Sequence, residues 1–552
     1  MMKKILYILI AVFVLSACSE DISEYTTQAD GLRDENAEKQ KEIKEKLEKL
    51  EAEKRKAALL KQKLDSLEKV KSGMLPEPLL MTMEFTTADN KDLSKDAVCV
   101  VHSNGIVDCW LPSMQDSKML VPRFTFEGTL VAMDNTEVVS GSTQIDFKEP
   151  VVLSVMTSKD KKDYTVYVHS YTGLPVMRID TENGVNITSK EEYVAAHMKL
   201  TEDVVTKTRG AGDVVDANLR IRGRGNSTWG LPKKPYRLKF DEKVSLLGEH
   251  KDKDWVLLAN YSDKSMLRNH LAFAIGKMSN LDWTPSSHFV EVVLNGRYDG
   301  TYQLVEKVEI SNHRVAVGDD GFILEVEARA PQEEDSRFFM SDFINYAIDI
   351  KEPEVEYDDE NYNYAVNFVK EAENCLFSGN FDLLWSQYFD INSFVDWYII
   401  HEIAKNEDSM FHFSCYMNLK RNGKLSMGPI WDFDIAFGNV KEDNTTAMLP
   451  EGLMLDWSAW YTRLMQDSRF VAKLKSRYDY FYSHKAEIMN MINNDAWYLR
   501  SSVQENQNRW GTWYHYTYKQ WDIWGSYQNE VQSLKTWLNT RMEWLKKEFD
   551  KM

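Results

Sequence analysis

Residues from about Asp34 to Lys71 contain neither glycine nor proline and consist mainly of Lys, Glu, Ala and Leu. Apolar residues recur there in steps of mostly three, four and seven, at Ile43, Leu47, Leu50, Ala57, Leu64 and Leu67. This spacing predicts a helix with one apolar stripe, roughly 55 Å long at about 1.5 Å per residue. Lys54 and Lys61 stand where a heptad needs apolar residues, so a single solvated helix and a loose oligomer both satisfy the pattern. We interpret residues 18–75 as an anchor followed by a helical or coiled-coil stalk.

The first residues read as a lipoprotein signal peptide. Lys3 and Lys4 precede an apolar run over 5–15, and Leu15-Ser16-Ala17-Cys18 has the form of a lipobox. We expect residues 1–17 to be removed and the Cys18 thiol to carry a lipid that holds the chain on a membrane. The alternative is an ordinary signal peptide with a coincidental cysteine. Ser19-Glu20-Asp21 resembles the acidic export tag of Bacteroidetes lipoproteins, which implies an outer-membrane lipoprotein on the cell surface.

Residues 79–173 change to short β-branched runs cut by turn signals such as Asn104-Gly105 and Ser140-Gly141. This pattern predicts an all-β sandwich, and its end resembles the immunoglobulin-like modules of bacterial surface lipoproteins. Cys99 and Cys109 flank Ser103-Asn104-Gly105, where a three-residue loop would set them opposite each other across a hairpin. A disulfide and a pair of buried free thiols both fit this spacing, because one residue of register separates them.

Charge and cysteine content exclude several classes of protein. The formal net charge is −19 and is spread along the chain, which argues against sequence-independent binding of nucleic acid. The five cysteines include no C-x-x-C pair, which argues against zinc ribbons and dense disulfide scaffolds.

Residues 174–552 hold the candidate chemistry. Strand-like runs come first and helical patterns dominate beyond about Asn361, which predicts an α+β domain with two lobes and a cleft between them. The whole chain is thus expected to be multidomain, with a helical stalk, an all-β sandwich and an α+β domain in that order.

The first candidate motif in this domain is the glycine-rich run 222–230. Arg222, Arg224 and Asn226 lie among three glycines and two hydroxyl residues, a composition that suits phosphate oxygens. A glycine-rich hairpin turn explains the glycines equally well.

The second motif is the alternating run 236–240. Period-two alternation places Arg237 and Lys239 on one face of a strand, from which they point either into a cleft or into solvent. Glu306 and Glu309 are candidate partners for such a lysine, although surface ion pairs are the default for both.

The third motif combines Asn406-Glu407-Asp408 with Asn418 and the run 429–439. On a strand, Asp432 and Asp434 would share one face, where two carboxylates repel unless a cation lies between them. Mg²⁺ or Mn²⁺ suits such oxygens and leaves positions for phosphate. An aspartate pair that caps a turn or binds arginines is the alternative.

Tryptophans are frequent near the C-terminus, at 497, 510, 513, 521, 524, 537 and 544. Exposed tryptophans stack on sugar rings, but the helical spacing of Trp537, Arg541 and Trp544 favours core packing. The histidines show no spacing typical of metal ligands, and we interpret them as structural.

Four motifs in order resemble the CotH family, named for a spore-coat protein. They are Arg222-Gly223-Arg224-Gly225-Asn226-Ser227-Thr228-Trp229, then Lys234-Pro235-Tyr236-Arg237-Leu238-Lys239-Phe240, then 254–265, then Trp431-Asp432-Phe433-Asp434-Ile435-Ala436-Phe437-Gly438-Asn439. The resemblance covers roughly residues 174–550. It implies an atypical protein-kinase-like fold that uses ATP with Mg²⁺ or Mn²⁺ to phosphorylate protein serines.

The resemblance also implies roles for individual residues. Asp408 takes the acidic position of the catalytic loop, Asp432 the metal-binding position with Asp434 beside it, and Lys239 the position that reaches the α- and β-phosphates, with Glu306 as its partner. An ordinary kinase has asparagine five residues after the catalytic aspartate, whereas this chain has Phe413, and Asn418 is the nearest candidate for a second metal. Asp-Phe-Asp also replaces Asp-Phe-Gly.

The sequence therefore leaves two alternative functions open. The first is a membrane-anchored exported kinase whose partners are protein acceptors in the envelope or outside the cell, with a possible oligomer through the stalk. The second is a surface adhesion or glycan-binding lipoprotein that carries a non-catalytic kinase-like domain.

Overall fold

The computed structural model describes residues 77–93, 96–111, 118–201, 214–407, 410–440, 445–456, 458–517 and 522–552. The expected signal peptide 1–17, the lipidated Cys18 and the stalk 18–75 lie outside these residues, as do Asp408 and Trp521. Within the described residues, no helix is both long and apolar enough to cross a membrane.

Residues 79–170 form strands without a helix among their described positions, in keeping with the expected β-rich segment. The strands are β1 (Leu79–Phe85), β2 (Ala97–Val98), β3 (Val100–Val101), β4 (Ile106–Leu111), β5 (Met119–Leu120), β6 (Arg123–Glu127), β7 (Leu130–Met133), β8 (Thr136–Glu137), β9 (Ile145–Asp146), β10 (Val151–Met156) and β11 (Lys161–Ser170). The immunoglobulin-like topology stays a prediction.

The chain divides into two compact units, and the division cuts through these strands. The first unit is Met1–Met81, Thr125–Val138 and Ser154–Lys162. In it, β7 and β8 form a hairpin whose turn residues Asp134 and Asn135 have positive φ, and the end of β10 pairs with β7. The second unit is Thr82–Phe124, Val139–Leu153 and Asp163–Met552, and it contains every element from β12 onward.

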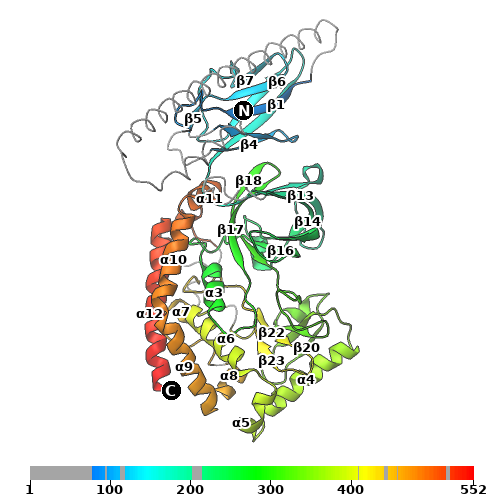
Figure 1. Cartoon of the computed structure of the whole chain (residues 1–552), viewed down its shortest axis with the longest axis vertical. Helices are drawn as coiled ribbons and strands as arrows, with labels where there is room; N and C mark the ends of the chain where they lie inside the picture. The colour runs from blue at the N-terminus through cyan, green and yellow to red at the C-terminus, as the bar shows by residue number, and fades with distance from the viewer. Residues whose placement is uncertain are drawn as a thin grey trace, which may run out of the picture. The chain divides into compact units, whose positions relative to one another are not determined.

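A closed barrel follows in the second unit, in the order β12-β13-β14-β15-β16-β18-β17. Its strands are β12 (Val176–Thr181), β13 (Val194–Thr201), β14 (Val214–Gly223), β15 (Tyr236–Val244), β16 (Asp252–Leu258), β17 (Ser287–Leu294) and β18 (Arg297–Glu306) (Figure 1). Alternate side chains fill the inside, Ile221, Leu238, Trp255 and Leu304 among them. Parallel pairing of β12 with β17 closes the barrel.

A second sheet has the order β20-β21-β19-β22-β23. These strands are β19 (Phe322–Val326), β20 (Phe338–Met340), β21 (Ala347–Glu352), β22 (Cys415–Leu419) and β23 (Leu425–Met427). The barrel and this sheet are the two strand-built parts of the α+β domain.

Helices occupy most of the remaining chain. They are α3 (Arg268–Lys277), α4 (Glu360–Leu376), α5 (Phe381–Leu384), α6 (Ile391–Ala404), α7 (Thr445–Met448), α8 (Ala459–Leu464), α9 (Ser468–Ser483), α10 (Lys485–Leu499), α11 (Ser502–Trp510) and α12 (Tyr527–Lys551). Short 3₁₀ turns are η1 (Glu182–Gly184), η2 (Ser227–Gly230), η3 (Ala330–Gln332), η4 (Trp385–Gln387) and η6 (Thr512–Tyr514). Side-chain caps begin several helices: Asp359 accepts from the Tyr362 amide before α4, and Asp390 from the Ser393 amide before α6.

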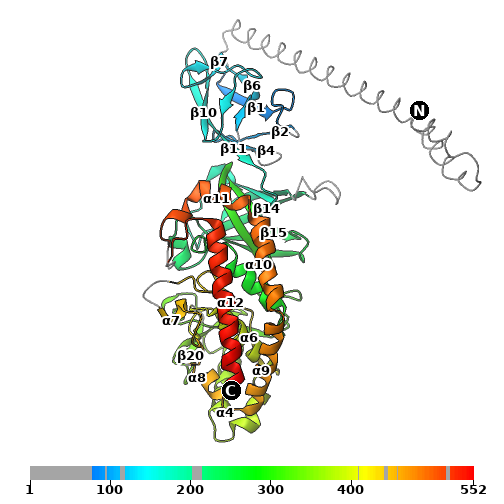
Figure 2. The same ribbon diagram turned by 90° about the vertical axis from the view of Figure 1, so that its left-hand side faces the viewer.

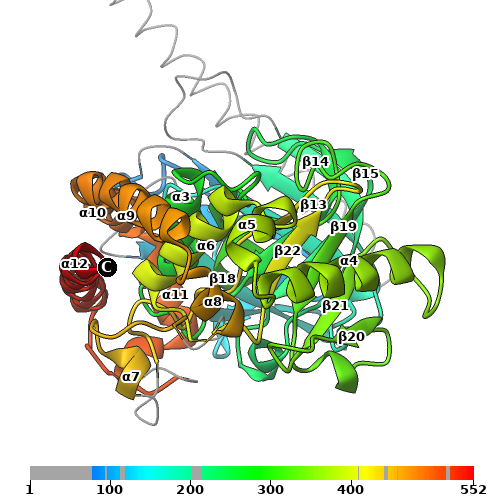
Figure 3. The same ribbon diagram turned by 90° about the horizontal axis from the view of Figure 1, so that it is seen from below.

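The long C-terminal helix α12 lies beside α9 and α10 (Figure 2). Figure 3 shows the same three helices from another side. One large apolar cluster joins this helical layer to α3, α6 and the outer face of the barrel. Trp537 and Trp544 pack against that cluster, as their helical spacing predicts, whereas Trp497 is 65% exposed.

Candidate functional site

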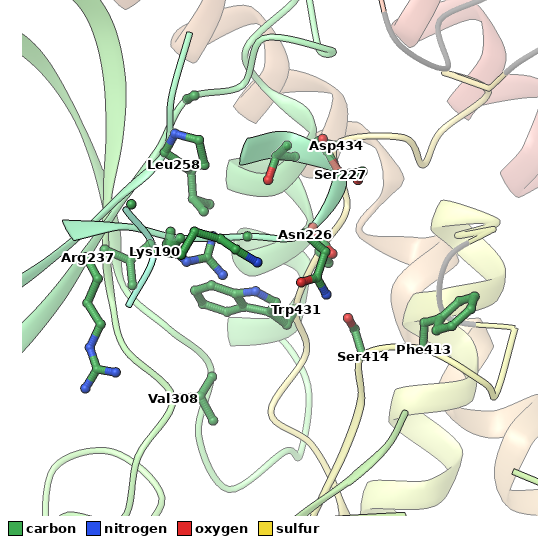
Figure 4. A pocket seen from close by; sticks show the side chains of 18 of the residues that line it. Lys190, Asn226, Ser227, Arg237, Leu258, Val308, Phe413, Ser414, Trp431 and Asp434 are labelled. Atoms are coloured by element: carbon green, nitrogen blue, oxygen red, sulfur yellow. The ribbon is translucent and has the colours of Figure 1, made fainter. Parts of the chain in front are cut away.

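A cavity of about 910 Å³ lies between the barrel and the second sheet. The loop between β14 and β15, the end of β16, the segment 325–335, the start of β22 and the loop 431–435 all contribute to it (Figure 4). Arg222, Arg224, Asn226, Asp432 and Asp434 all line this one cavity. These five predicted residues lie up to about two hundred positions apart in the chain, and only the tertiary fold brings them together.

The glycine-rich run forms the β14–β15 connection, so the turn interpretation accounts for its glycines. Gly225 has φ +81, and an added Cβ would collide with the Thr228 hydroxyl. At Gly223 an added Cβ would collide with the Trp229 ring. The turn also brings the Lys234 amine to the Trp229 carbonyl, at 2.7 Å. Arg222 and Arg224, which line the cavity, therefore lie on a hairpin whose backbone is tightly constrained.

Arg224 is a cation of this hairpin that interacts electrostatically with both aspartates. Its guanidinium carbon lies 5.5 Å from the centre of the Trp431 ring. Burial lowers the pKa of Arg224, and the carboxylates of Asp432 and Asp434 oppose that effect. Because an arginine keeps its charge under such conditions, Arg224 supplies a fixed positive charge beside two acidic groups.

Arg222 and Asn226 sit differently in the same hairpin. Arg222 donates to the Glu191 carbonyl at 3.1 Å and stacks over the Tyr193 ring at 4.7 Å. Asn226 is exposed at the cavity wall. Both remain within reach of a ligand that enters the cavity, but Arg222 is already held by a neighbouring segment.

The Asp-Phe-Asp segment is an irregular loop, which corrects the predicted strand. Asp432 has φ +66, a left-handed conformation far from the φ of a regular strand. Asn406 donates to the Asp432 carbonyl at 2.8 Å, and Asn269 accepts from the Phe433 amide at 2.7 Å. Asn439 donates to the Asp434 carbonyl at 2.6 Å. Side-chain amides, two from distant segments and one from Asn439 in the same segment, thus replace a strand's backbone ladder, and both carboxylates still reach the cavity.

The buried His401 ring packs against this loop. Its ring stacks on Trp397 at 3.9 Å between centroids and lies 4.9 Å from the Phe433 ring. Burial lowers the pKa of His401 to about 3, so the imidazole is neutral at physiological pH. The residue acts in packing, as interpreted from the sequence.

Lys239 and Glu306 do not line the cavity. Arg237, on the same face of β15 but closer to the hairpin, lines it, and its guanidinium bonds Asp254 Oδ1 at 2.6 and 3.0 Å. Lys239 lies farther along the strand, opposite Asp254 in register. Glu306 lies 3.7 Å from Arg314 and accepts from the Ser286 amide. Neither residue of the predicted Lys239–Glu306 pair therefore contributes to this cavity.

Asn418 also lies elsewhere. It is part of β22, its side chain donates to the Gly428 carbonyl at 3.2 Å, and it lines a separate cavity. Asp408 lies outside the described residues, although Asn406, two residues earlier, is bonded to the Asp432 loop.

Sequence reasoning missed the wall formed by Glu325, Glu327 and Tyr416. Burial raises the pKa of Glu325 to about 7, and Lys351 at 3.4 Å opposes that effect. Glu327 is bonded to Arg329. The period-two alternation of β19 was the available signal, because it places Glu325 on the face opposite Leu324.

The chemistry of the donors is compatible with Mg²⁺ at Asp432 and Asp434. Among the described residues there is no group of three or more His, Cys, Asp or Glu placed to hold a metal ion. Mg²⁺ needs fewer protein ligands, since it is commonly held by one or two carboxylates with water and substrate phosphates. Two carboxylates on one loop, with a fixed cation opposite, satisfy that requirement.

The family model described as CotH kinase protein matches residues 220–545. The match covers more than half of the chain, so the protein belongs to the CotH family, a family of kinase-like proteins. The resemblance expected from the motifs is therefore confirmed. The matched span begins just before the glycine-rich hairpin and ends in α12, and it contains every cavity-lining residue named above except Glu191.

No curated protein matches the chain. A solved structure from Bacteroides thetaiotaomicron, described as a candidate glycoside hydrolase, shares 14% identity, covers 48% of this chain and 80% of its own, and has a TM-score of 0.15.

Proposed function

We propose that this chain is an exported, membrane-anchored kinase that transfers the γ-phosphoryl group of ATP to serine side chains of envelope or secreted proteins. The observation that carries this proposal is that Arg224, Asp432 and Asp434 line one cavity within the CotH region. Phosphoryl transfer depends mainly on positioned charge around the phosphates, and this cavity supplies charge of both signs on constrained loops.

Each cavity residue has a proposed role. Arg224 binds the phosphates as a fixed cation, with Arg222 and Asn226 contributing from the same hairpin, and Arg237 takes the place that the sequence suggested for Lys239. Asp432 and Asp434 would hold Mg²⁺ or Mn²⁺, which when bound neutralises phosphate charge. Asp408 orients the acceptor hydroxyl, a role that rests on the family motif alone.

The surroundings of the site are part of the same proposal. The lipobox at Cys18 would anchor the chain to the outer membrane, and the stalk would carry the kinase domain to acceptors at the cell surface. The stalk is also the segment through which copies of the chain would associate.

The test is transfer of label from γ-labelled ATP by the full chain, with Mg²⁺ or Mn²⁺ and casein as a generic acceptor. We expect Asp432→Asn and Arg224→Gln each to lower the initial rate by about 100-fold or more, because each removes charge next to the phosphates. Asp479→Asn is the matched control, since Asp479 is a surface carboxylate of α9 that pairs with Lys546 at 3.2 Å. It should transfer label at the parental rate.

Binding and transfer are separated by a second measurement. ATP with Mg²⁺ should raise the melting temperature of the parent and of Asp479→Asn, and should raise that of Arg224→Gln much less. If the parent neither incorporates label nor gains heat stability from ATP with metal, the kinase proposal fails.

The alternative is glycan binding at the surface of the molecule. Trp497, Tyr514, Tyr516 and Trp524 are all exposed, by 65, 70, 70 and 42%, and exposed rings stack on sugars. A chain that binds immobilised glycans, loses that binding on Trp497→Ala, and shows no transfer would favour this second function.

A further inference from the structure

Cys99 and Cys109 face each other across the β3–β4 hairpin. Val100 pairs with Asp108 and Val101 with Val107, so the same antiparallel register sets Cys99 opposite Cys109. The hairpin begins at the His102 amide, which donates to the Ile106 carbonyl at 2.8 Å. Of the two registers that the sequence left open, the structure contains the one that brings the thiols together.

The hydrogen-bond pattern makes this a close pair. The Cys99 amide donates to the Met83 carbonyl on the opposite side, at 2.9 Å, so its backbone groups point away from β4. Residues in such a non-hydrogen-bonded antiparallel pair have Cα atoms about 4.5 Å apart and side chains close together. That separation lies within the range of about 4.4–6.8 Å that a disulfide spans.

The environment of the two thiols is shared and dry. Cys99 is 6% exposed and Cys109 is fully buried. Burial and the adjacent Cys109 thiol both raise the pKa of the Cys99 thiol. Cys375 in α4 and Cys415 in β22 are the other described cysteines, and each lies on an element of its own.

We propose that Cys99 and Cys109 form a cross-strand disulfide as the hairpin folds in an oxidising compartment. Two S–H bonds break and one S–S bond forms, so the pair loses two electrons and two protons. An exchanging disulfide, of a protein or of oxidised glutathione, accepts them and becomes a dithiol or two thiols. Formation accompanies folding because the finished hairpin buries both sulfurs.

The disulfide would brace a strand that makes several long-range contacts. Asp108, next to Cys109 on β4, lies 3.4 Å from His169 of β11 and 3.5 Å from Arg178 of β12. Trp110, on the other side of Cys109, packs edge-on against Tyr298 of β18, with ring centroids 5.7 Å apart. Fixing the hairpin therefore fixes the strand that carries these contacts toward the barrel.

The test refolds the reduced full chain in a mixture of reduced and oxidised glutathione, blocks free thiols after denaturation, and maps the peptides by mass. We expect one peptide pair linked through Cys99 and Cys109, lighter by two hydrogens than its reduced form, with Cys375 and Cys415 alkylated. A reductant should lower the melting temperature of this material by several degrees. The same reductant should leave the melting temperature of Cys99→Ala/Cys109→Ala unchanged.

Cys375→Ala/Cys415→Ala is the matched control and should form the same linked peptide. Quantitative alkylation of Cys99 and Cys109 in refolded material, or linkage of either to a different cysteine, would overturn the proposal. The mapping is made on the unaltered chain, so the result does not depend on whether a variant folds or on any kinase activity.

Discussion

Asp432 has a left-handed backbone conformation. Substitutions at this position can therefore separate the effect of the backbone on stability from the effect of the carboxylate on the site. The residue has φ +66 and sits in a loop whose neighbours are bonded to Asn269, Asn406 and Asn439. Left-handed φ costs a side-chain-bearing residue about 1–2 kcal/mol, although aspartate tolerates it better than most. The strain remains because the surrounding amides fix the loop.

We therefore expect Asp432→Gly to abolish phosphoryl transfer without loss of folding stability, since glycine adopts this φ without strain. Asp432→Val should abolish transfer and also lower the free energy of unfolding, by about 1–3 kcal/mol, because a β-branched residue disfavours this φ. Urea denaturation of both variants beside the parent measures the difference. Equal stability of the glycine and valine variants would show that the loop relaxes.

Some of the residues that line the cavity could be predicted from the sequence alone, and others could not. Arg224, Asp432 and Asp434 were predictable, because a glycine-rich run with arginines and an aromatic-flanked aspartate pair carry recognisable chemistry. The choice between Arg237 and Lys239 was not, because both occupy the same face of β15 and only the position of the hairpin decides which one meets the cavity. The strand expected for 431–435 failed because its backbone groups bond side-chain amides and local turn groups in place of a neighbouring strand.

At the scale of elements, a buried ion pair joins helix α12 to α6, in addition to the apolar cluster that they share. Arg541 donates to Glu402 Oε2 at 2.6 Å, to the Glu402 carbonyl and to the carbonyls of Pro450 and Gly452. Glu402 Oε1 accepts from the amides of Met454 and Leu455. Both side chains of the pair are fully buried, so α6, α12 and the 450–455 segment meet in a network with satisfied polar groups.

Arg541→Met should lower the free energy of unfolding by about 3–5 kcal/mol, because it leaves the Glu402 carboxylate buried without its cation. Lys546→Met is the control on the same helix, since Lys546 is partly exposed and pairs with Asp479 and Asp550. That change should cost no more than about 1 kcal/mol. Chemical denaturation of the two variants measures both losses in the free energy of unfolding. Equal losses would mean that the buried ion pair stabilises the fold no more than the exposed one does.

Elements with local signals were predictable and those with distant partners were not. Helical spacing indicated a helical region beyond about Asn361, and α4 begins next to that position, at Glu360. Barrel closure had no such signal, because β12 pairs with β17 more than a hundred residues away. The sequence of a strand alone does not reveal which distant strand will form backbone hydrogen bonds with its edge.

For the whole molecule, residues 82–124, 139–153 and 163–173 are not separate from the domain that follows them. They belong to the same compact unit as the barrel and helices. The contact centres on His169 of β11, which is buried and lies 3.4 Å from Asp108 and 3.9 Å from Glu505 of α11. Trp110, Tyr167 and Tyr298 also surround its ring. A single titratable ring thus joins strands expected in one module to a helix of the next.

This contact should make stability depend on pH. Burial lowers the pKa of His169, but the carboxylates of Asp108 and Glu505 outweigh burial and raise the pKa above its usual value. The folded state therefore favours the imidazolium, and the resulting stabilisation is complete below about pH 6.5 and is lost as pH rises through the folded pKa. The pKa of Glu505 is lowered, because His169 and Lys118 outweigh its burial, so its contribution is lost only in acid. The contribution of His169 to the unfolding free energy should thus fall between neutral and mildly alkaline pH.

His169→Gln removes the titrating ring, and we expect it to flatten this pH dependence while lowering stability most at pH 6 and least at pH 9. Denaturation midpoints of the parent and the variant at several pH values test the expectation. His197→Gln is the control, since His197 also pairs with a carboxylate, Asp216 at 2.7 Å, but half of its side chain is exposed. A parent–variant difference in midpoint that does not change from pH 6 to 9 would mean that folding leaves the pKa of His169 unshifted. The contact between β11 and α11 would then depend on ring packing alone.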